Sequence, residues 1–245
     1  MFSPATLEAD SIGKSFRGRK VLTSASLQAN AASVTAVIGR MGAGKSTLLR
    51  ICAGLVEPDS GWVRLAAVQY TRPRLHRLAR GGLYFMGELS GLAESLTIRQ
   101  HFAIVAQRFG VTLDEQLIEI FSLSPFMERK PHRLSTGERR RAELALAISR
   151  RPRCFIADEP FRELDPVTCE LLGSGIKRLA SNGCAVIVSG HEIHTIFEYA
   201  DCVTWVTAGT TYQLGTRDQA TRDERLVREF LGPTALRKQQ QSELP

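Results

Sequence analysis

The sequence predicts an α/β fold in which a mostly parallel sheet is interrupted by a helical insertion. Short apolar runs of the length and β-branched character of buried strands recur at Val34–Ile38, Cys154–Ala157, Ala185–Ser189 and Val203–Val206. Between Leu92 and Arg150 this strand pattern fades and helical spacing takes its place. The composition, 43% hydrophobic and 23% charged over 245 residues, excludes a disordered or collagen-like chain and allows a sizeable core.

The first predicted strand, Val34–Ile38, runs into a glycine-rich turn, and a helix follows over Lys45–Ala53. Gly54 is a natural end for that helix, because glycine adopts the left-handed conformation of many helix C-termini. Glu57–Gly61 has the composition of a turn. The expected order is therefore a strand, a tight turn, a helix and a second turn that reverses the chain direction.

The insertion is predicted to contain three helices, Ile98–Phe109, Leu113–Phe121 and Glu138–Arg150. We expect one domain over residues 1–232, with a core of about 1–91 and 151–232 and a helical subdomain of about 92–150. Gly232-Pro233 should end the last helix, which leaves residues 233–245 as a flexible, glutamine-rich tail.

Charge and cysteine content set limits on partners and compartment. Lys+Arg 32 against Asp+Glu 25 gives a net charge of +7, which fits an anionic partner without separating a nucleotide from nucleic acid or lipid. The arginines of Arg72–Arg80 have no interleaved aromatic residues apart from Tyr70, so we expect a solvated or lipid-headgroup-facing edge and no nucleic acid. Five scattered cysteines and a start, Met1–Ala9, unlike a signal peptide favour a reducing cytoplasm.

Apolar runs such as Cys184–Val188 are far shorter than the roughly 20 residues that span a bilayer. If this chain acts at a membrane, we expect another chain to cross it.

The glycine-rich turn matches the phosphate-binding pattern G-x-x-x-x-G-K-[ST] in its required place between a strand and a helix. Its residues are Gly39, Arg40, Met41, Gly42, Ala43, Gly44, Lys45, Ser46 and Thr47. Backbone N–H groups of such a turn surround phosphate oxygens, and the helix N-terminus adds positive potential. Lys45 is predicted to reach the β- and γ-phosphates and Ser46 to coordinate Mg²⁺. The sequence therefore predicts binding of a nucleoside triphosphate.

A pair of carboxylates follows the buried run Cys154–Ala157. Asp158 is predicted to hold Mg²⁺ through water, and Glu159 to polarise the water that attacks the phosphate. Such a pair alone is usually a solvated turn. Its place after a buried strand, downstream of the phosphate-binding turn, favours the catalytic interpretation.

Leu134–Arg141 opens the third helix of the insertion. Ser135 and Glu138 have the spacing of a capping box, but three arginines in the first turn oppose the helix dipole. Two interpretations remain open. The arginines pair with Glu138 and Glu143, or the helix end faces the phosphates of a second nucleotide site.

Together these motifs resemble the nucleotide-binding subunit of ABC transporters over nearly the whole chain. The correspondence is as follows: Gly39–Thr47 with Walker A, Leu134–Glu138 with the LSGGQ signature, Phe155–Glu159 with Walker B, Glu163–Asp165 with the D-loop, His191 with the switch histidine and Phe16 with the aromatic residue on adenine. The resemblance implies a P-loop NTPase (RecA-like) core with an antiparallel β part and an inserted helical subdomain.

Several of these assignments have simpler alternatives. Phe16 taken alone is a core aromatic residue. Asp165 before Pro166 is also a good helix N-cap, and this role can hold together with the D-loop role. His191 and His194 lack the H-E-x-x-H spacing and a third ligand, so we do not expect zinc.

The chain departs from the family at two positions. Glu88 stands where the family usually has the Q-loop glutamine; it keeps an oxygen for Mg²⁺ or water but adds charge near the γ-phosphate. Thr136 replaces the first glycine of the signature, and its Cβ restricts the backbone there. We expect slower turnover at such a site, which keeps Ser135 and Gly137.

The resemblance further implies that two such domains, identical or different, close head to tail over two ATP molecules with Mg²⁺. Each site takes Walker A, Asp158, Glu159 and His191 from one domain, and Ser135 and Gly137 from the other. Glu88 and the helical insertion then face a transmembrane permease at the cytoplasmic side of the membrane. Two alternatives stay open: a soluble ABC-type ATPase of the Fe–S-assembly kind, and a non-hydrolysing ATP-binding module.

Overall fold

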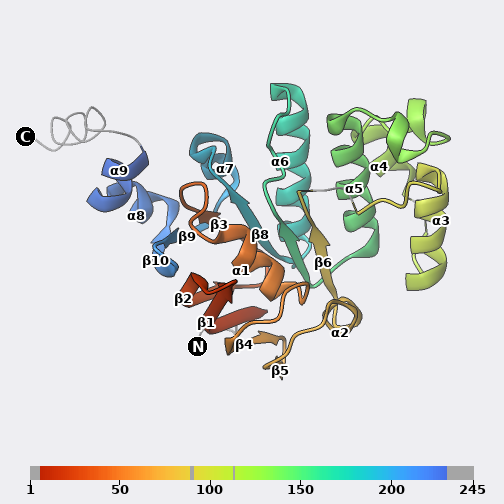
Figure 1. Cartoon of the computed structure of the whole chain (residues 1–245). Helices are drawn as coiled ribbons and strands as arrows, with labels where there is room; N and C mark the ends of the chain where they lie inside the picture. Colours follow the sequence, from red (N-terminus) through yellow and green to blue (C-terminus); the bar gives the residue numbers. More distant parts are fainter. Residues whose placement is uncertain (1–5, 89–90, 113, 231–245) are drawn as a thin grey trace, which may run out of the picture.

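The computed structural model describes residues 6–88, 91–112 and 114–230. Within these residues a ten-stranded sheet runs in the order β5-β4-β1-β2-β10-β9-β3-β8-β7-β6 (Figure 1). The strands are β1 Leu7–Phe16, β2 Arg19–Ala29, β3 Ser33–Ile38, β4 Ser60–Leu65, β5 Val68–Tyr70, β6 Leu83–Met86, β7 Cys154–Ala157, β8 Ala185–Gly190, β9 Cys202–Thr207 and β10 Thr210–Thr216.

The central strands β9, β3, β8, β7 and β6 are parallel, as the sequence predicts. All residues of β7 and β8 are buried, because helices cover both faces of this part and leave no polar side. The predicted runs are confirmed, with β8 extended to Gly190 and β9 extended to Cys202–Thr207.

The antiparallel part joins β1 to β2 and β4, and β4 to β5. It meets the parallel part through a single parallel pair, Thr210 of β10 with Ser24 of β2. β10 is antiparallel to β9. This confirms the antiparallel part that the resemblance implies, although no strand of it was predicted individually from the sequence.

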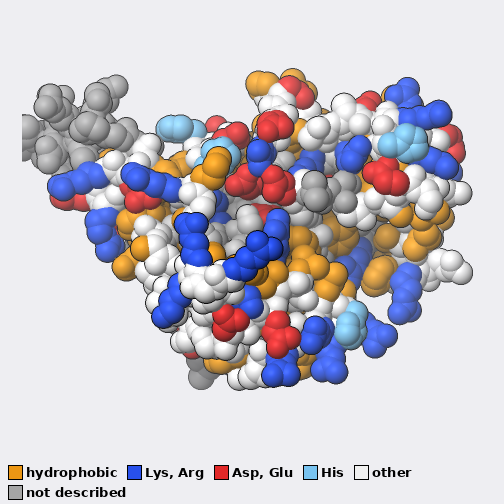
Figure 2. Space-filling view, in the orientation of Figure 1, with side chains coloured by type: hydrophobic (Ala, Val, Ile, Leu, Met, Phe, Trp, Pro, Cys, Tyr) orange, Lys and Arg blue, Asp and Glu red, His pale blue; other side chains and the backbone are white. Residues whose placement is uncertain are grey.

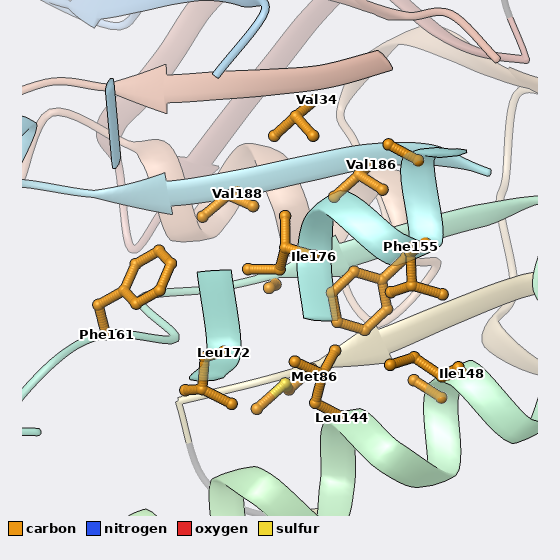
Figure 3. Close-up of a cluster of buried hydrophobic side chains, with 14 of the residues drawn as sticks. Val34, Met86, Leu144, Ile148, Phe155, Phe161, Leu172, Ile176, Val186 and Val188 are labelled. Atoms are coloured by element: carbon orange, nitrogen blue, oxygen red, sulfur yellow. The ribbon is translucent and has the colours of Figure 1, made fainter. Parts of the chain in front are cut away.

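Two hydrophobic clusters lie on the two faces of the parallel strands. On one face, α1 (Lys45–Cys52) packs Leu48 and Leu49 against the sheet. On the other face lie α6 (Pro166–Ser181) and α7 (Ile193–Tyr199). Figure 3 shows Ile176 of α6 close to Val186 and Val188 of β8. The parallel strands are thereby fixed in place between helices.

The helical insertion lies at one side of the molecule, on the right in Figure 1. It contains α3 (Ile98–Phe109), α4 (Glu115–Ile120) and α5 (Thr136–Arg150), and the described residues of 91–150 form no strand. Phe121 and Leu144 join its core to that of the parallel sheet.

The predicted helices of the insertion are confirmed with small shifts at their ends. α5 begins at Thr136, before the predicted Glu138. Leu113, the predicted start of the second helix, lies outside the described residues, and Asp114 is the N-cap of α4.

The remaining helices are α2 (Leu75–Arg80), α8 (Arg217–Arg222) and α9 (Glu224–Phe230). Gly232-Pro233 and the predicted tail 233–245 lie outside the described residues. Among the helices that the structure describes, none is long and apolar enough to cross a membrane.

Candidate functional site

The phosphate-binding turn lies between β3 and α1, at the carboxyl end of the parallel strands. Gly44 caps α1 with a φ of 106°, and an added Cβ there would lie 2.7 Å from Leu22 Cδ2. Lys45 is 4% exposed, and its Nζ donates to the carbonyl oxygens of Gly39 at 2.8 Å and Arg40 at 3.2 Å. The ammonium group is thus held over the turn in which a phosphate would bind.

Burial lowers the pKa of Lys45, and the carboxylates of Glu159 and Asp158 partly oppose this by favouring the charged form. A buried cation at this point gains most from an anionic ligand, because few solvent molecules compete with that ligand. The electrostatics therefore fit a phosphate.

Asp158 is almost fully buried at the end of β7, with 1% of its surface exposed. Its Oδ1 accepts hydrogen bonds from Ser46 Oγ at 3.0 Å and from Ser189 Oγ at 2.7 Å. Its Oδ2 has no hydrogen-bond partner among the described residues. A buried carboxylate oxygen without a partner, next to a hydroxyl oxygen, is the donor set that suits a hard divalent cation such as Mg²⁺.

Glu159 follows directly, in a backbone conformation that side chains rarely adopt, with a φ of 51°. Its N–H donates to Ser189 Oγ at 3.1 Å, so the same hydroxyl fixes both acidic residues. Its Oε1 lies 3.7 Å from Nδ1 of His191, which follows β8. The structure brings together the two residues that the sequence placed at the catalytic step.

Glu88 follows β6 and faces the same hollow. Its Oε1 lies 2.5 Å from Nη1 of Arg162, and that nitrogen is also 3.7 Å from Glu159 Oε2. Arg162 was missed by the sequence analysis. In the sequence it is visible only as a cation three residues after Glu159. The contact of Arg162 with Glu88 depends on the pairing of β6 with β7, which the sequence does not show.

A hollow of about 330 Å³ contains these groups. It is lined by Val21, Met41, Gly42, Gly44, Lys45, Ser46, Thr47, Glu88, Glu159 and Arg162. A second hollow of about 670 Å³ shares Val21, Met41 and Gly42 with it. Val21, on β2, was also missed, and it brings the antiparallel part next to the phosphate-binding turn. Figure 2 shows basic and acidic side chains gathered in the middle of the face that is seen in Figure 1.

The predicted capping box at the start of α5 is present. Ser135 Oγ accepts from Glu138 N at 3.2 Å, and Glu138 Oε2 accepts from Ser135 N at 2.8 Å. Thr136 and Gly137 form the first turn of α5. An added Cβ at Gly137 would lie 3.3 Å from Thr168 Oγ1 on α6. Ser135, Thr136, Gly137 and Glu138 are not among the described residues that line the hollow around Lys45.

The three consecutive arginines near the start of α5, Arg139–Arg141, make contacts within the chain. Arg139 donates to the Pro131 carbonyl at 2.8 Å, and Arg141 donates to the Phe121 carbonyl at 3.2 Å. Arg140 lies 3.4 Å from Glu143, one of the two acids predicted to pair with them.

Arg139 lies 3.7 Å from Glu94. Of the two predicted acidic partners, Glu143 is confirmed because it pairs with Arg140. Glu138 instead takes part in the capping box.

Phe16 is 45% exposed at the end of β1, and Lys14 Nζ lies 5.4 Å from its ring centroid. The alternative of a core aromatic residue is therefore wrong, and the ring is open to stacking. Asp165 is the N-cap of α6, with Oδ1 and Oδ2 accepting from Thr168 N at 2.9 Å and Thr168 Oγ1 at 2.6 Å. These hydrogen bonds lower the pKa of Asp165. The N-cap role of Asp165 is confirmed.

Comparison with known proteins gives consistent results. A protein-family model described as "ABC transporter" matches residues 22–162, more than half of the chain. The lipopolysaccharide export system ATP-binding protein LptB of Haemophilus influenzae is 29% identical over 233 residues, covering 92% of this chain and 97% of that protein. A probable ABC transporter ATP-binding protein of Azorhizobium caulinodans is 28% identical over 240 residues, covering 94% of this chain and 85% of that protein.

A solved structure described as the ATP-binding subunit of an ABC transporter superposes with a TM-score of 0.78 at 25% identity. The match covers 90% of this chain and 94% of that chain.

Proposed function

Since the chain belongs to the ABC transporter family, we propose that it is the ATP-hydrolysing subunit of a membrane transporter. It energises movement of a solute through a separate transmembrane partner. The observation that carries this proposal is the meeting of Lys45, Ser46, Asp158, Glu159 and His191 at the carboxyl ends of three neighbouring parallel strands. That arrangement places a phosphate-binding turn, a metal-binding carboxylate and a general base around one reacting group.

Each residue has a separate part in this chemistry. Lys45 and the N–H groups of Gly42–Ser46 bind the β- and γ-phosphates. Ser46 and Asp158 hold Mg²⁺, which neutralises charge on the phosphate oxygens when it is bound. Glu159 accepts a hydrogen bond from the attacking water and orients it towards the γ-phosphorus. His191, beside Glu159, stabilises the charge that develops on the transferred group.

The exposed ring of Phe16 stacks on the adenine in this proposal, and the second hollow beside Val21 takes the sugar and base. Aromatic stacking needs an accessible face, and the 45% exposure of Phe16 provides one.

We propose that the working unit is a head-to-tail dimer, because the first turn of α5 lies outside the hollow around Lys45. In such a dimer Ser135 and Gly137 of one copy approach the γ-phosphate bound to the other copy. The free N–H groups of a helix N-terminus stabilise an anion. Binding of ATP thus favours the closed dimer, and loss of the γ-phosphate releases it.

The permease partner is proposed to contact the helical insertion and the segment after Glu88 at the cytoplasmic face of a membrane. The relative from Haemophilus influenzae is named as part of a lipopolysaccharide export system, which supports export as the direction. The solute is selected by the membrane partner.

The test is phosphate release with Mg²⁺ATP, measured for the wild type and for Glu159→Gln, with dimerisation followed by light scattering. We expect turnover in the wild type, and in the variant a loss of at least about a hundredfold, as for removal of a general base, with an ATP-dependent dimer. Glu170→Gln makes the same chemical change at an exposed position of α6 and should leave turnover intact.

Absence of both turnover and dimer in the wild type would contradict the proposal for the isolated chain. Thr136→Gly with Glu88→Gln would then decide whether the two departures from the family have disabled it. Recovery of turnover would favour the non-hydrolysing ATP-binding module as the function of the natural sequence. Partition of the protein with membranes separates a transporter subunit from a soluble assembly ATPase.

A further inference from the structure

Arg162 makes contacts that the proposed mechanism does not use. Its Nη1 lies 2.5 Å from Glu88 Oε1 and 3.7 Å from Glu159 Oε2, and its Nε lies 3.3 Å from Glu163 Oε1. It also lines the hollow that contains Lys45. One guanidinium group therefore faces three carboxylates, two of which line the same hollow.

The need for a cation at this point follows from the charges around the hollow. Asp158 and Glu159 are required near the γ-phosphate, and Glu88 adds a third carboxylate where a neutral side chain would suffice for a hydrogen bond. A triphosphate is itself highly anionic, so each uncompensated carboxylate opposes its binding. Arg162 lies nearest to Glu88, the carboxylate that adds this extra charge.

Glu88 is also held through its backbone by the helical insertion. Arg140 of α5 donates from Nη1 to the Gly87 carbonyl at 2.5 Å and from Nη2 to the Glu88 carbonyl at 2.7 Å. Arg140 is 6% exposed, and both of these bonds are partly buried. Glu88 is thus held through its backbone by Arg140 and through its side chain by Arg162.

We propose that Arg162 is a positioning residue that neutralises Glu88 and holds it beside Glu159, so that a carboxylate at this position remains compatible with ATP binding. The inference rests on the proposed ATP site. Arg162 acts through Glu88, and its importance therefore depends on the charge at position 88. A simple surface ion pair, by contrast, would contribute little and independently of ATP.

A double-mutant cycle tests this dependence. The variants are Arg162→Met, which keeps an unbranched, flexible side chain but removes the guanidinium group and its charge, Glu88→Gln, and the two combined. Affinity for the Mg²⁺ complex of the non-hydrolysable analogue AMP-PNP is measured by titration calorimetry. Phosphate release at varied ATP concentration gives kcat and KM for the same variants.

We expect Arg162→Met alone to weaken AMP-PNP binding about tenfold, an effect of the size that the loss of one contacting charge can have. In the Glu88→Gln background the same substitution should weaken binding by less than about threefold, because no extra carboxylate remains to be neutralised. Arg162→Lys should restore part of the affinity, since it keeps the charge but loses the planar group. The change should appear mainly in KM.

Arg178→Met is the matched control. Arg178 is similarly exposed and lies 3.6 Å from Asp114, outside the hollow around Lys45. It should leave AMP-PNP affinity unchanged. Thermal unfolding without nucleotide checks that none of the variants owes its effect to misfolding.

Two results would overturn the inference. One is an equal loss of affinity in both backgrounds, which would show that Arg162 acts independently of Glu88. The other is unchanged affinity in Arg162→Met. If the wild type itself failed to bind AMP-PNP, the proposed ATP site would be wrong as well, so the two failures are distinguishable.

Discussion

The hydroxyl of Ser189 offers a direct test of how the two acidic residues are held. It is fully buried, donates to Asp158 Oδ1 at 2.7 Å and accepts from Glu159 N at 3.1 Å. Ser189→Ala removes a hydrogen bond to a buried carboxylate, for which about 1.5–3 kcal/mol is typical, and leaves an amide unpaired at a cost of about 1–3 kcal/mol. Allowing for relaxation, we expect a loss of about 2–4 kcal/mol in the free energy of unfolding.

The rate of phosphate release should fall as well. Glu159 is held at a φ of 51°, and among the described residues Ser189 provides the one side-chain hydrogen bond to its N–H, which the substitution removes. The measurements are urea unfolding followed by circular dichroism, and phosphate release. For a chain of this size the loss corresponds to a fall of about 5–15 °C in Tm.

Ser149→Ala is the matched control for this experiment. Ser149 is also buried, but its hydroxyl donates to the Ala145 carbonyl of its own helix at 3.0 Å, a bond that contributes little. It should change stability by less than about 0.5 kcal/mol. If Ser189→Ala were equally mild, the carboxylates would be positioned by something other than these hydrogen bonds, and the reasoning would be refuted.

Two further predictions concern packing and pH. Gly175→Ala should lower the free energy of unfolding by about 1 kcal/mol, since the added Cβ would lie 2.7 Å from side chains of the helical insertion, while helix propensity offsets part of the strain. Chemical denaturation checks this, and Ser174→Ala, exposed on the same helix, should not destabilise. The pKa of Asp223 is lowered chiefly by the side chain of Arg225, so its contribution is present above about pH 4 and is lost as pH falls through the folded pKa. Asp223→Asn should therefore lower the free energy of unfolding at pH 7 by about 0.5 kcal/mol, and the difference should shrink as the pH falls below about 4. A difference that did not shrink in acid would contradict the assignment.

The parallel strands were predictable because their burial leaves a simple pattern. Val34–Ile38 and Ala185–Ser189 are continuous apolar runs, and a strand covered by helices on both faces needs such a run. The antiparallel strands lack it. β2 alternates buried with exposed residues, and β10 contains no fully buried residue, so neither stands out from a loop in the sequence.

The same distinction applies to the site. Lys45, Ser46, Asp158 and Glu159 belong to contiguous motifs, whose spacing carries the chemistry by itself. Arg162 does not, because its contact with Glu88 arises only once β6 pairs with β7. Tertiary contacts of this kind have no local sequence signature.

The order of the strands explains why the motifs must meet. β3 pairs with β8 so that Ile38 lies opposite Gly190, and β7 pairs with β8 so that Ala157 lies opposite Val188. Because the carboxyl ends of parallel strands lie at one edge of a sheet, the residues that follow these strands are brought to that edge together.

The strand at the end of this row, β6, places Glu88 at the same edge, and the chain then enters the helical insertion. Arg140 of that insertion holds the backbone of Glu88, while Arg162 holds its side chain from the loop that carries Glu159. A change of charge at the γ-phosphate would therefore be felt by the Glu88 side chain, and the backbone carbonyl of the same residue is bound at 2.7 Å by Arg140 of the insertion. Coupling between hydrolysis and the insertion then requires no long pathway, because Glu88 both lines the hollow around Lys45 and contacts Arg140 of the insertion.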